Sequence, residues 1–318
     1  GDIRENYMPI GDIIFMIAGT GAFLYFTFSA NQIINQGTRF APYQIVIGII
    51  GIAALIELTR RCVGLPILFV AGFFLIYALA VGLTNPAFLG RVKFLVRNLF
   101  YTKEGIFSTP VNVCSKYIVV FIIFGAFLER TGISNFFIQL ANCIAGKYAG
   151  GPAKVAVISS ALCGMVSGSS VGNTVTTGSV TIPMMKDTGY KPEFAGAVEA
   201  ASSTGGQIMP PIMGAAAFLM ADFVGVPYSN IIVRAILPAL LYFTGIFISV
   251  HLEAKKLGLS GIPKEKLPVF KLLIRKIYLL LPLVMLVIWV SGNYMTMQKA
   301  ASYAIVLSVI VSLFDKEN

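Results

Sequence analysis

Long apolar stretches recur along the whole 318-residue chain, and they constrain its fold more than any other feature. A helix that crosses the roughly 30 Å hydrocarbon core of a bilayer needs about 20 predominantly apolar residues. Hydrophobic residues make up 57% of the chain and charged residues only 12%, so a soluble protein of this composition could not cover its surface. The sequence therefore predicts an all-α polytopic membrane protein, and its candidate spans are residues 10–30, 43–58, 64–83, 111–128, 228–250, 272–291 and 299–314.

Two further apolar stretches, 152–183 and 193–222, are too long for one ordinary span. Each has about 30 residues and would be roughly 45 Å long as a single helix at 1.5 Å per residue. Each must therefore break, tilt steeply or fold back. We expect about eight transmembrane helices in total, together with one re-entrant helical hairpin at 152–183 and a broken helix at 193–222.

The net charge of +10 is interpreted as a topology signal and not as affinity for nucleic acid. Cytoplasmic loops of membrane proteins carry an excess of Lys and Arg. The loop 251–271 is rich in lysine, so we place it in the cytoplasm together with the N-terminus. A re-entrant hairpin at 152–183 then keeps Arg60, Arg61 and Lys147 inside, whereas a straight span would move them outside. The distribution of charge favours the hairpin.

Two segments mix basic or polar residues with apolar ones at helical spacing. The segments Arg91–Tyr101 and Ile133–Tyr148 fit amphipathic helices that lie in the membrane plane, and ordinary connecting helices are the alternative. The basic stretch Arg91–Lys103 faces either a protein partner or lipid headgroups.

The most informative stretch runs from Ser167 to Ser179, where glycines interrupt a dense set of uncharged polar side chains. Backbone that leaves the helix inside a membrane survives only within protein or beside a water-filled cavity. A polar, glycine-rich tip between two apolar arms meets that requirement, because opened carbonyls and hydroxyls offer ligands to a hard monovalent cation and the next helix N-terminus suits an anion. The alternative is tight packing through small residues repeated every four positions; these are Ala156, Ser160, Gly164, Gly168, Gly172 and Thr176.

A second interruption, Ser202–Pro211, lies inside an otherwise apolar stretch. It contains a glycine pair and a proline pair, and each proline removes a backbone donor and crowds an earlier carbonyl. The helix should therefore unwind there and expose Ser203, Thr204 and Gln207. The alternative is a proline kink that binds nothing.

Glu199 is an acidic residue about two turns inside the broken stretch, ahead of this interruption. An ionisable group inside a membrane costs about 2.5–3.5 kcal/mol or more, so a functional role is the default hypothesis. Glu199 is therefore a candidate proton-coupling residue, with a position at the cytoplasmic interface as the alternative.

Signals of enzymatic chemistry are absent from the sequence. The four cysteines are far apart and the only histidine is His251, so neither a transition-metal site nor a nucleophile paired with a base is expected. We expect no enzyme and no bound cofactor other than a coupling ion.

The run from Ser167 to Tyr228, SGSSVGNTVTTGSVTIPMMKDTGYKPEFAGAVEAASSTGGQIMPPIMGAAAFLMADFVGVPY, closely resembles the fused membrane permease of tripartite ATP-independent periplasmic (TRAP) transporters, and in particular the TAXI-associated type. The segments Phe124–Leu162 and Leu237–Leu259 resemble the same subunit. The resemblance covers essentially the whole chain and is most specific at its centre.

This resemblance implies a secondary transporter of the bacterial inner membrane that imports an organic acid by cation symport. Na⁺ is the coupling ion of the better-known members, and H⁺ is the alternative here. A soluble periplasmic binding protein, of TAXI type, would deliver the substrate, and the permease would move as an elevator within the lipid bilayer. By position, the implied cation-binding residues are Ser167, Gly168, Ser169, Ser170, Asn173, Thr174, Thr204, Gly205 and Gly206, and the implied substrate-binding residues are Ser170, Asn173, Thr176, Thr177, Gln207 and Pro210.

The resemblance also suggests how the chain is organised. Residues 1–105 resemble the small-subunit region, which we expect to be incomplete, and residues 106–318 resemble the first half of the large subunit. The family has two inverted halves, and no second hairpin motif follows Pro211. We therefore expect half of an inverted-repeat transporter, which needs the remaining half as a partner. A non-transporting scaffold subunit is the alternative, and a membrane-embedded enzyme is the least favoured one.

Overall fold

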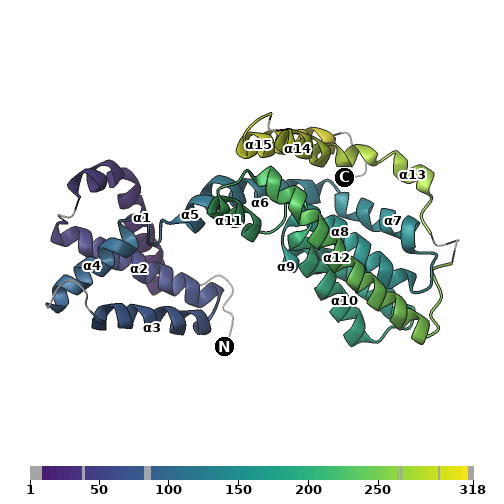
Figure 1. Cartoon of the computed structure of the whole chain (residues 1–318), viewed down its shortest axis with the longest axis horizontal. Coiled ribbons are helices and arrows are strands. Elements are labelled where there is room, and N and C mark those ends of the chain that lie inside the picture. Colours follow the sequence, from purple (N-terminus) through teal and green to yellow (C-terminus); the bar gives the residue numbers. More distant parts are fainter. Residues whose placement is uncertain are drawn as a thin grey trace. The chain divides into compact units, whose positions relative to one another are not determined.

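The computed structural model describes residues 9–37, 40–81, 87–263, 265, 267–292 and 294–313. Within those residues the regular elements are helices, and no strand occurs among them (Figure 1). This confirms the all-helical class. The chain divides into two compact units, Gly1–Asn112 and Val113–Asn318, and each is described by itself. Our predicted boundary was at residue 105.

The first unit is built from long apolar helices and one amphipathic helix. Its elements are α1 (Ile10–Gln36), α2 (Pro42–Cys62), α3 (Leu65–Val81), α4 (Phe88–Phe100) and the start of α5 (Thr109–Val113).

Helix α4 is the first of the two segments that we predicted to be amphipathic. Its apolar face packs on α2, where glycines leave a flat surface. A Cβ atom on Gly48 would lie 2.6 Å from Val96 Cγ1, and one on Gly51 would lie 2.2 Å from Phe100 Cε2. Val96 and Phe100 are buried as a result. The amphipathic helix is therefore present, and its placement in the membrane plane stays a prediction.

The second unit contains the hairpin and the broken helix. A continuous helix, Thr109–Arg130, is formed by α5, the π-helical turn η1 (Cys114–Ile118) and α6 (Val119–Arg130). It is followed by α7 (Ile133–Ala145), α8 (Gly151–Ser167), α9 (Ser170–Asp187), α10 (Pro192–Gly205), η2 (Gly206–Ile208), α11 (Ala215–Val224), α12 (Tyr228–Lys256), α13 (Phe270–Ile274), η4 (Ile277–Leu280), α14 (Leu281–Ser291) and α15 (Met297–Leu313).

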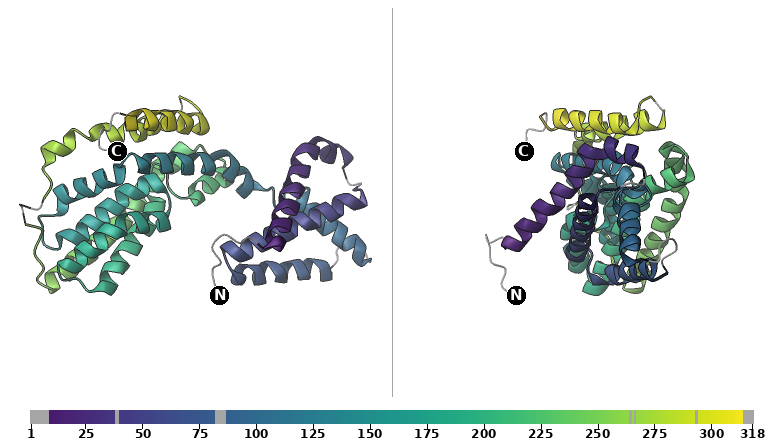
Figure 2. Two further views of the ribbon diagram at one scale, coloured as in Figure 1. Left: turned by 180° about the vertical axis from the view of Figure 1, so that it is seen from behind. Right: turned by 90° about the vertical axis from the view of Figure 1, so that its left-hand side faces the viewer.

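Helices α8, α9, α10 and α12 lie side by side and form the part of this unit that positions the candidate site (Figure 2). Small residues allow this close packing, because Ala153, Ala156, Ala195 and Ala254 are all fully buried in one apolar cluster. The second predicted amphipathic segment is α7, which buries Phe136 and Phe137 and packs on α8.

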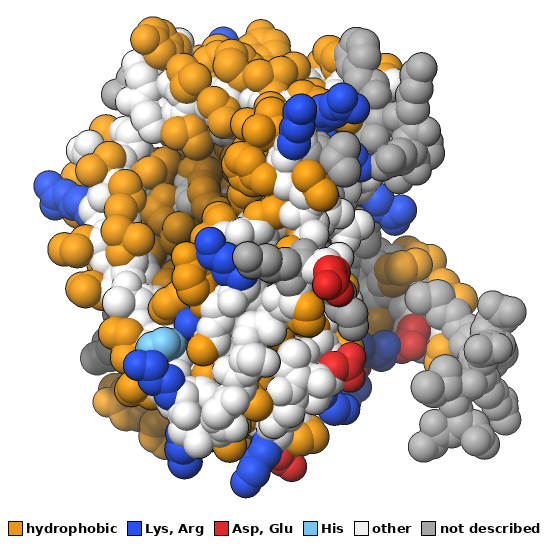
Figure 3. Space-filling model, turned by 90° about the vertical axis from the view of Figure 1, so that its right-hand side faces the viewer, with side chains coloured by type: hydrophobic (Ala, Val, Ile, Leu, Met, Phe, Trp, Pro, Cys, Tyr) orange, Lys and Arg blue, Asp and Glu red, His pale blue; other side chains and the backbone are white. Residues whose placement is uncertain are grey.

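Four helices of the described chain are long and apolar enough to cross a membrane: Ile10–Gln36, Pro42–Cys62, Thr109–Arg130 and Tyr228–Lys256. Large apolar side chains are also widely exposed, as the face in Figure 3 illustrates. Helix α3 is an extreme case, since none of its 17 residues is buried. A surface of this kind suits a lipid environment.

The predicted span 272–291 differs from the others, because the structure divides it among α13, η4 and α14. Pro282 stands at the start of α14, where the missing N–H of proline costs nothing. The number of spans in the whole protein stays a prediction.

Candidate functional site

The turn of the helical hairpin lies at Gly168 and Ser169, between the end of α8 and the start of α9. Gly168 has φ 60°, a left-handed conformation that favours glycine. Ser169 caps α9, because its side-chain oxygen accepts a hydrogen bond from the Gly172 N–H at 3.2 Å. The polar, glycine-rich stretch therefore forms a defined turn between two helices.

The break in the other stretch lies where the sequence places its glycine and proline pairs. Helix α10 ends at Gly205, a short 3₁₀ turn η2 follows, and the chain stays non-helical from Met209 until α11 begins at Ala215. The fold of the break agrees with the effect of Pro210 and Pro211, which cannot donate helical hydrogen bonds.

The hairpin turn and the break are in direct contact. A Cβ atom on Gly164 would lie 2.3 Å from Gly206 Cα, and one on Gly168 would lie 2.2 Å from the Met213 carbonyl oxygen. Only glycine permits these two backbone approaches. The Gln207 Nε2 also donates a hydrogen bond to Ser170 Oγ at 2.9 Å. We call this contact region the tip junction, defined by Gly164, Gly168–Asn173, Gly206–Gln207 and Met213.

Asn173 occupies the buried centre of the tip junction and is 1% exposed. Its Nδ2 donates to the Ser160 carbonyl oxygen at 2.8 Å, so the amide is oriented with Oδ1 on the opposite side. That Oδ1 atom is buried without a hydrogen-bond partner among the described residues. A Cβ atom on Gly206 would lie 3.3 Å from Asn173 Nδ2, which places the break against this amide.

A buried acceptor of this kind is costly, because leaving it unsatisfied costs about 1–3 kcal/mol. The nearby stretches 155–185 and 200–221 carry no formal charge. The tip junction therefore offers a neutral oxygen that a cation could satisfy.

A second polar cluster surrounds Glu199, which is fully buried. Its Oε1 accepts hydrogen bonds from Ser160 Oγ at 2.8 Å and from Ser203 Oγ at 3.0 Å. Thr177 donates to the same oxygen and Thr181 donates to Oε2. We call these five residues the Glu199 cluster. It connects α8, α9 and α10 through one carboxyl group. Whether Glu199 lies at membrane depth or near the cytoplasmic interface stays a prediction.

The structure does not bring all the predicted site residues to the tip junction. Thr177 belongs to the Glu199 cluster instead. Thr174 and Thr176 donate to carbonyls one turn earlier in α9, at 2.8 and 2.9 Å. Thr204 is exposed and donates to the Ala200 carbonyl in its own helix. Pro210 is buried within the break.

The remaining predicted residues lie in the junction itself or beside it. Ser167 is half-buried at the end of α8, next to the turn. Gly205 is buried at the end of α10, and a Cβ atom there would lie 2.5 Å from Tyr242 Cε1 on α12. It therefore faces α12.

Sequence reasoning missed Ser160 and Thr181 as partners of Glu199. The signal was present as spacing: Thr177 and Thr181 are four residues apart on α9, as are Glu199 and Ser203 on α10, so each pair shares a helix face. A carboxyl group inside an apolar helix requires such donors nearby. Ser160 was assigned only to the stripe of small residues, and it both packs and donates.

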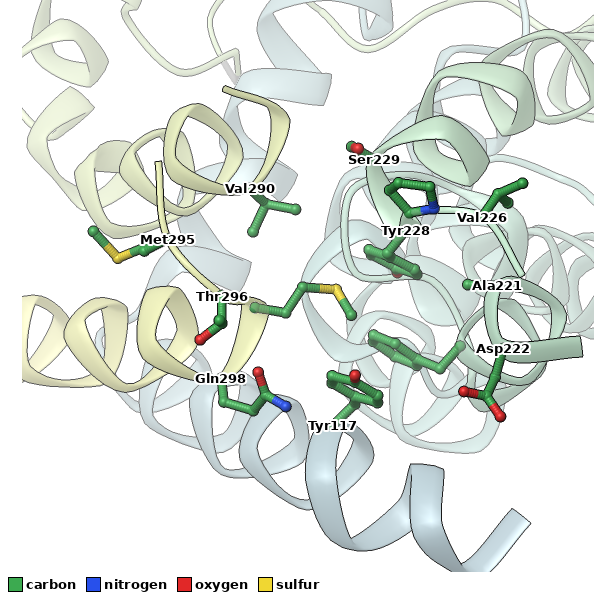
Figure 4. Close-up of a pocket in the computed structure, with 13 residues that line it drawn as sticks. Tyr117, Ala221, Asp222, Val226, Tyr228, Ser229, Val290, Met295, Thr296 and Gln298 are labelled. Atoms are coloured by element: carbon green, nitrogen blue, oxygen red, sulfur yellow. The ribbon is translucent and has the colours of Figure 1, made fainter. Parts of the chain in front are cut away.

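A separate pocket of about 380 Å³ lies between the α14–α15 region and the α11–α12 region (Figure 4). The Tyr117, Phe218 and Tyr228 rings stack in sequence there, with centroid distances of 6.1 and 4.5 Å. Because Phe218 and Tyr228 are buried, the stack mainly holds these helices together.

Comparison with known proteins identifies the family to which this architecture belongs. The sequence profile of the tripartite ATP-independent periplasmic transporter, DctM component, matches residues 50–318. The chain belongs to this family. The match confirms the TRAP large-permease resemblance, and it begins within the region that we assigned to the small subunit. The TAXI type stays a prediction.

Individual relatives of this TRAP permease chain agree with the profile. The C4-dicarboxylate TRAP transporter large permease protein DctM of Pseudomonas aeruginosa is 28% identical over 212 residues, which are 66% of this chain and 49% of the relative. The isethionate TRAP transporter permease protein DctMQ of Oleidesulfovibrio alaskensis is 26% identical over 258 residues, 79% of this chain and 40% of the relative. The sialic acid permease SiaT of Haemophilus influenzae is 26% identical over 144 residues, 45% of this chain and 23% of the relative.

The aligned part of the chain spans about half the length of the DctM relative and less of the other two. These named relatives are permease components of transporters and not enzymes. This agrees with the expectation that the chain is not an enzyme.

Proposed function

We propose that this TRAP permease chain carries the first hairpin of a binding-protein-dependent symporter, and that the tip junction binds the coupling cation. The observation that carries the proposal is the buried Asn173 Oδ1 atom, which has no hydrogen-bond partner among the described residues. A cation bound at this atom removes the cost of an unsatisfied acceptor and holds the hairpin turn against the break.

The chemistry of the tip junction favours Na⁺. Hydroxyl, amide and backbone carbonyl oxygens are the ligands that hard cations prefer. Helix α8 ends at the junction, so its last carbonyls point their negative dipole ends at the same region and favour a cation there.

Glu199 is the residue through which H⁺ coupling would run instead. Its partners are all hydroxyl groups, which can donate to a carboxylate or accept from a carboxylic acid. Thr177 and Thr181 also have backbone acceptors, the Asn173 and Thr177 carbonyls at 2.8 and 3.0 Å. The Glu199 cluster can therefore adjust to either protonation state without leaving a donor unpaired.

The working protein would require further components. We propose that it sits in the bacterial inner membrane with the N-terminus and loop 251–271 in the cytoplasm. A periplasmic binding protein, of TAXI type, would supply the substrate, and the second half of the large permease would complete the substrate site. Movement of the hairpin-bearing part against a scaffold would follow the elevator mechanism.

The test measures thermal unfolding of the purified chain in lipid nanodiscs, with NaCl or choline chloride at equal ionic strength. A ligand that binds only the folded state stabilises it by about 2.7 kcal/mol at one hundred times its Kd. We expect Na⁺ to raise the unfolding temperature of the wild type and to have no effect on Asn173→Ala. Asn142→Ala is the control, because Asn142 lies on α7 and donates within its own helix at 3.0 Å.

Equal Na⁺ stabilisation of Asn173→Ala and the wild type would contradict the cation site. If Na⁺ does not change the unfolding temperature of the wild type, the result would favour the alternative of a non-transporting scaffold subunit. Uptake by the complete permease with its binding protein, with Na⁺ and pH gradients imposed separately, then decides between Na⁺ at Asn173 and H⁺ at Glu199.

A further inference from the structure

A groove between α11 and α12 opens beside the tip junction and has a volume of about 410 Å³. Apolar residues from both helices supply most of its lining, including Ala217 and Met220 on α11. Gln207, Ile208 and Met213 from the break also line it. Because Gln207 donates to Ser170 Oγ, the groove is connected directly to the hairpin turn.

Two donor side chains stand on one face of α12 in this groove. Asn230 and Arg234 are four residues apart, so they are neighbours on the helix surface, and both line the groove. Neither side chain makes a hydrogen bond or ion pair with any residue that the structure describes. The N–H donors of both side chains are therefore available to a ligand or to solvent.

Arg234 is the only charged residue among the described residues that line the groove. It lies in a helix long and apolar enough to cross a membrane, in its second turn from Tyr228. A guanidinium at membrane depth is costly unless it reaches water or pairs with an anion. The Asp222 carboxylate on α11 lines the separate pocket of Figure 4 and not this groove.

We infer that the α11–α12 groove binds the carboxylate of an organic acid, with Arg234 as its anchor and Asn230 as a second donor. This inference rests on the proposed function, because it names the substrate anchor of the same transporter. A guanidinium presents paired N–H groups that match the two oxygens of a carboxylate. Gln207 lines the groove and donates a hydrogen bond to Ser170 Oγ, so a ligand in the groove would act on the hairpin turn through this side chain.

The lining also specifies the kind of acid. One cation in a groove that is otherwise uncharged and mostly apolar pairs with one carboxylate, and a second carboxylate would have no cationic partner there. The groove therefore selects a monocarboxylate with an apolar body over a dicarboxylate. Hexanoate is a suitable probe. The competitors are succinate, a dicarboxylate, and hexylamine, a cation with a six-carbon chain.

The test is equilibrium dialysis of radiolabelled hexanoate against the chain in phosphatidylcholine nanodiscs. We expect saturable binding that succinate and hexylamine do not displace, and Arg234→Gln should weaken it at least about tenfold. Asn230→Ala should weaken it less. Arg234→Lys keeps the charge without the paired donors and should be intermediate. Lys186→Gln removes a charge at the exposed end of α9 and should bind like the wild type.

Hexanoate binding of equal strength in Arg234→Gln and the wild type would overturn the inference, as would displacement by succinate. Binding of phosphatidylglycerol that depends on Arg234, without hexanoate binding, would also overturn it and assign the groove to lipid. The Na⁺ response of Asn173 is measured separately. Loss of that response with intact, Arg234-dependent hexanoate binding would refute the cation site and leave the groove assignment standing.

Discussion

The tip junction and the Glu199 cluster are adjacent on the same helices, yet they differ in how completely their polar atoms are paired. Asn173 and Thr177 are one turn apart on α9, and Asn173 belongs to the first region while Thr177 belongs to the second. Four hydroxyls satisfy the buried Glu199 carboxyl, whereas Asn173 Oδ1 has no partner among the described residues.

This difference suggests that the Glu199 cluster stabilises the helix packing, whereas the tip junction binds a ligand. A fully paired buried network holds its helices in one arrangement, and a buried acceptor without a partner is suited to a ligand. Variants of the Glu199 cluster should therefore change stability and leave the Na⁺ response, whereas variants of the tip junction should remove the Na⁺ response.

The largest effect on stability is expected for Glu199→Leu. This change leaves the Ser203 hydroxyl buried without its acceptor and removes the bonds that Ser160, Thr177 and Thr181 make to the carboxyl, so it should lower the free energy of unfolding by about 2–3 kcal/mol. Thermal unfolding in nanodiscs provides the measurement, with Na⁺ still raising the unfolding temperature. Glu193→Leu is the control, because Glu193 is exposed in the first turn of α10 and should contribute less than about 1 kcal/mol. Equal stability of the two variants would show that the cluster does not hold the helices together.

Gly164→Ala should have the next largest effect and should act on both properties. The added Cβ would lie 2.3 Å from Gly206 Cα, so backbone must move. Overpacking of this kind costs about 1–3 kcal/mol, and the displaced break should weaken Na⁺ stabilisation. Gly196→Ala is the matched control on α10, since a Cβ there meets no atom within 4 Å. A Gly164→Ala variant with a normal Na⁺ response would show that cation binding does not depend on the close backbone contact between Gly164 and Gly206.

A smaller effect is expected for Thr181→Val, which keeps the side-chain shape and removes one donor to Glu199. The loss should be about 1–2 kcal/mol, because three hydroxyls still donate to Oε1 while Oε2 loses the one donor that it has among the described residues. The exposed Ser179 donates only to the Thr176 carbonyl, so Ser179→Ala should be neutral. If uptake by the complete permease keeps its pH dependence in Thr181→Val but loses it in Glu199→Gln, the carboxyl itself carries the proton.

The sequence was sufficient to locate the helix interruptions. Gly168 and the polar residues around it predicted a turn, and Gly205–Gly206 with Pro210–Pro211 predicted unwinding, because these residues act on the local backbone. The structure has a turn at Gly168 and a non-helical segment at 209–214.

Partners across helices were harder to predict, because spacing gives the face of a helix and not the element that covers it. Thr174, Asn173 and Thr177 follow one another closely in the sequence, yet they bond to their own helix, to Ser160 and to Glu199 respectively. Packing decides among them. The stripe of small residues showed the same ambiguity, since Gly164 serves packing while placing α8 against the break.

The first turn of α12 is tied to the break by a single side chain. The buried Tyr228 hydroxyl lies within hydrogen-bonding distance of the carbonyls of Pro211 and Ile212, and its one proton is shared between them. These residues immediately precede Met213, whose carbonyl faces Gly168 in the hairpin turn. A rotation of α12 at this end would therefore displace the break, and with it the backbone that contacts the hairpin turn.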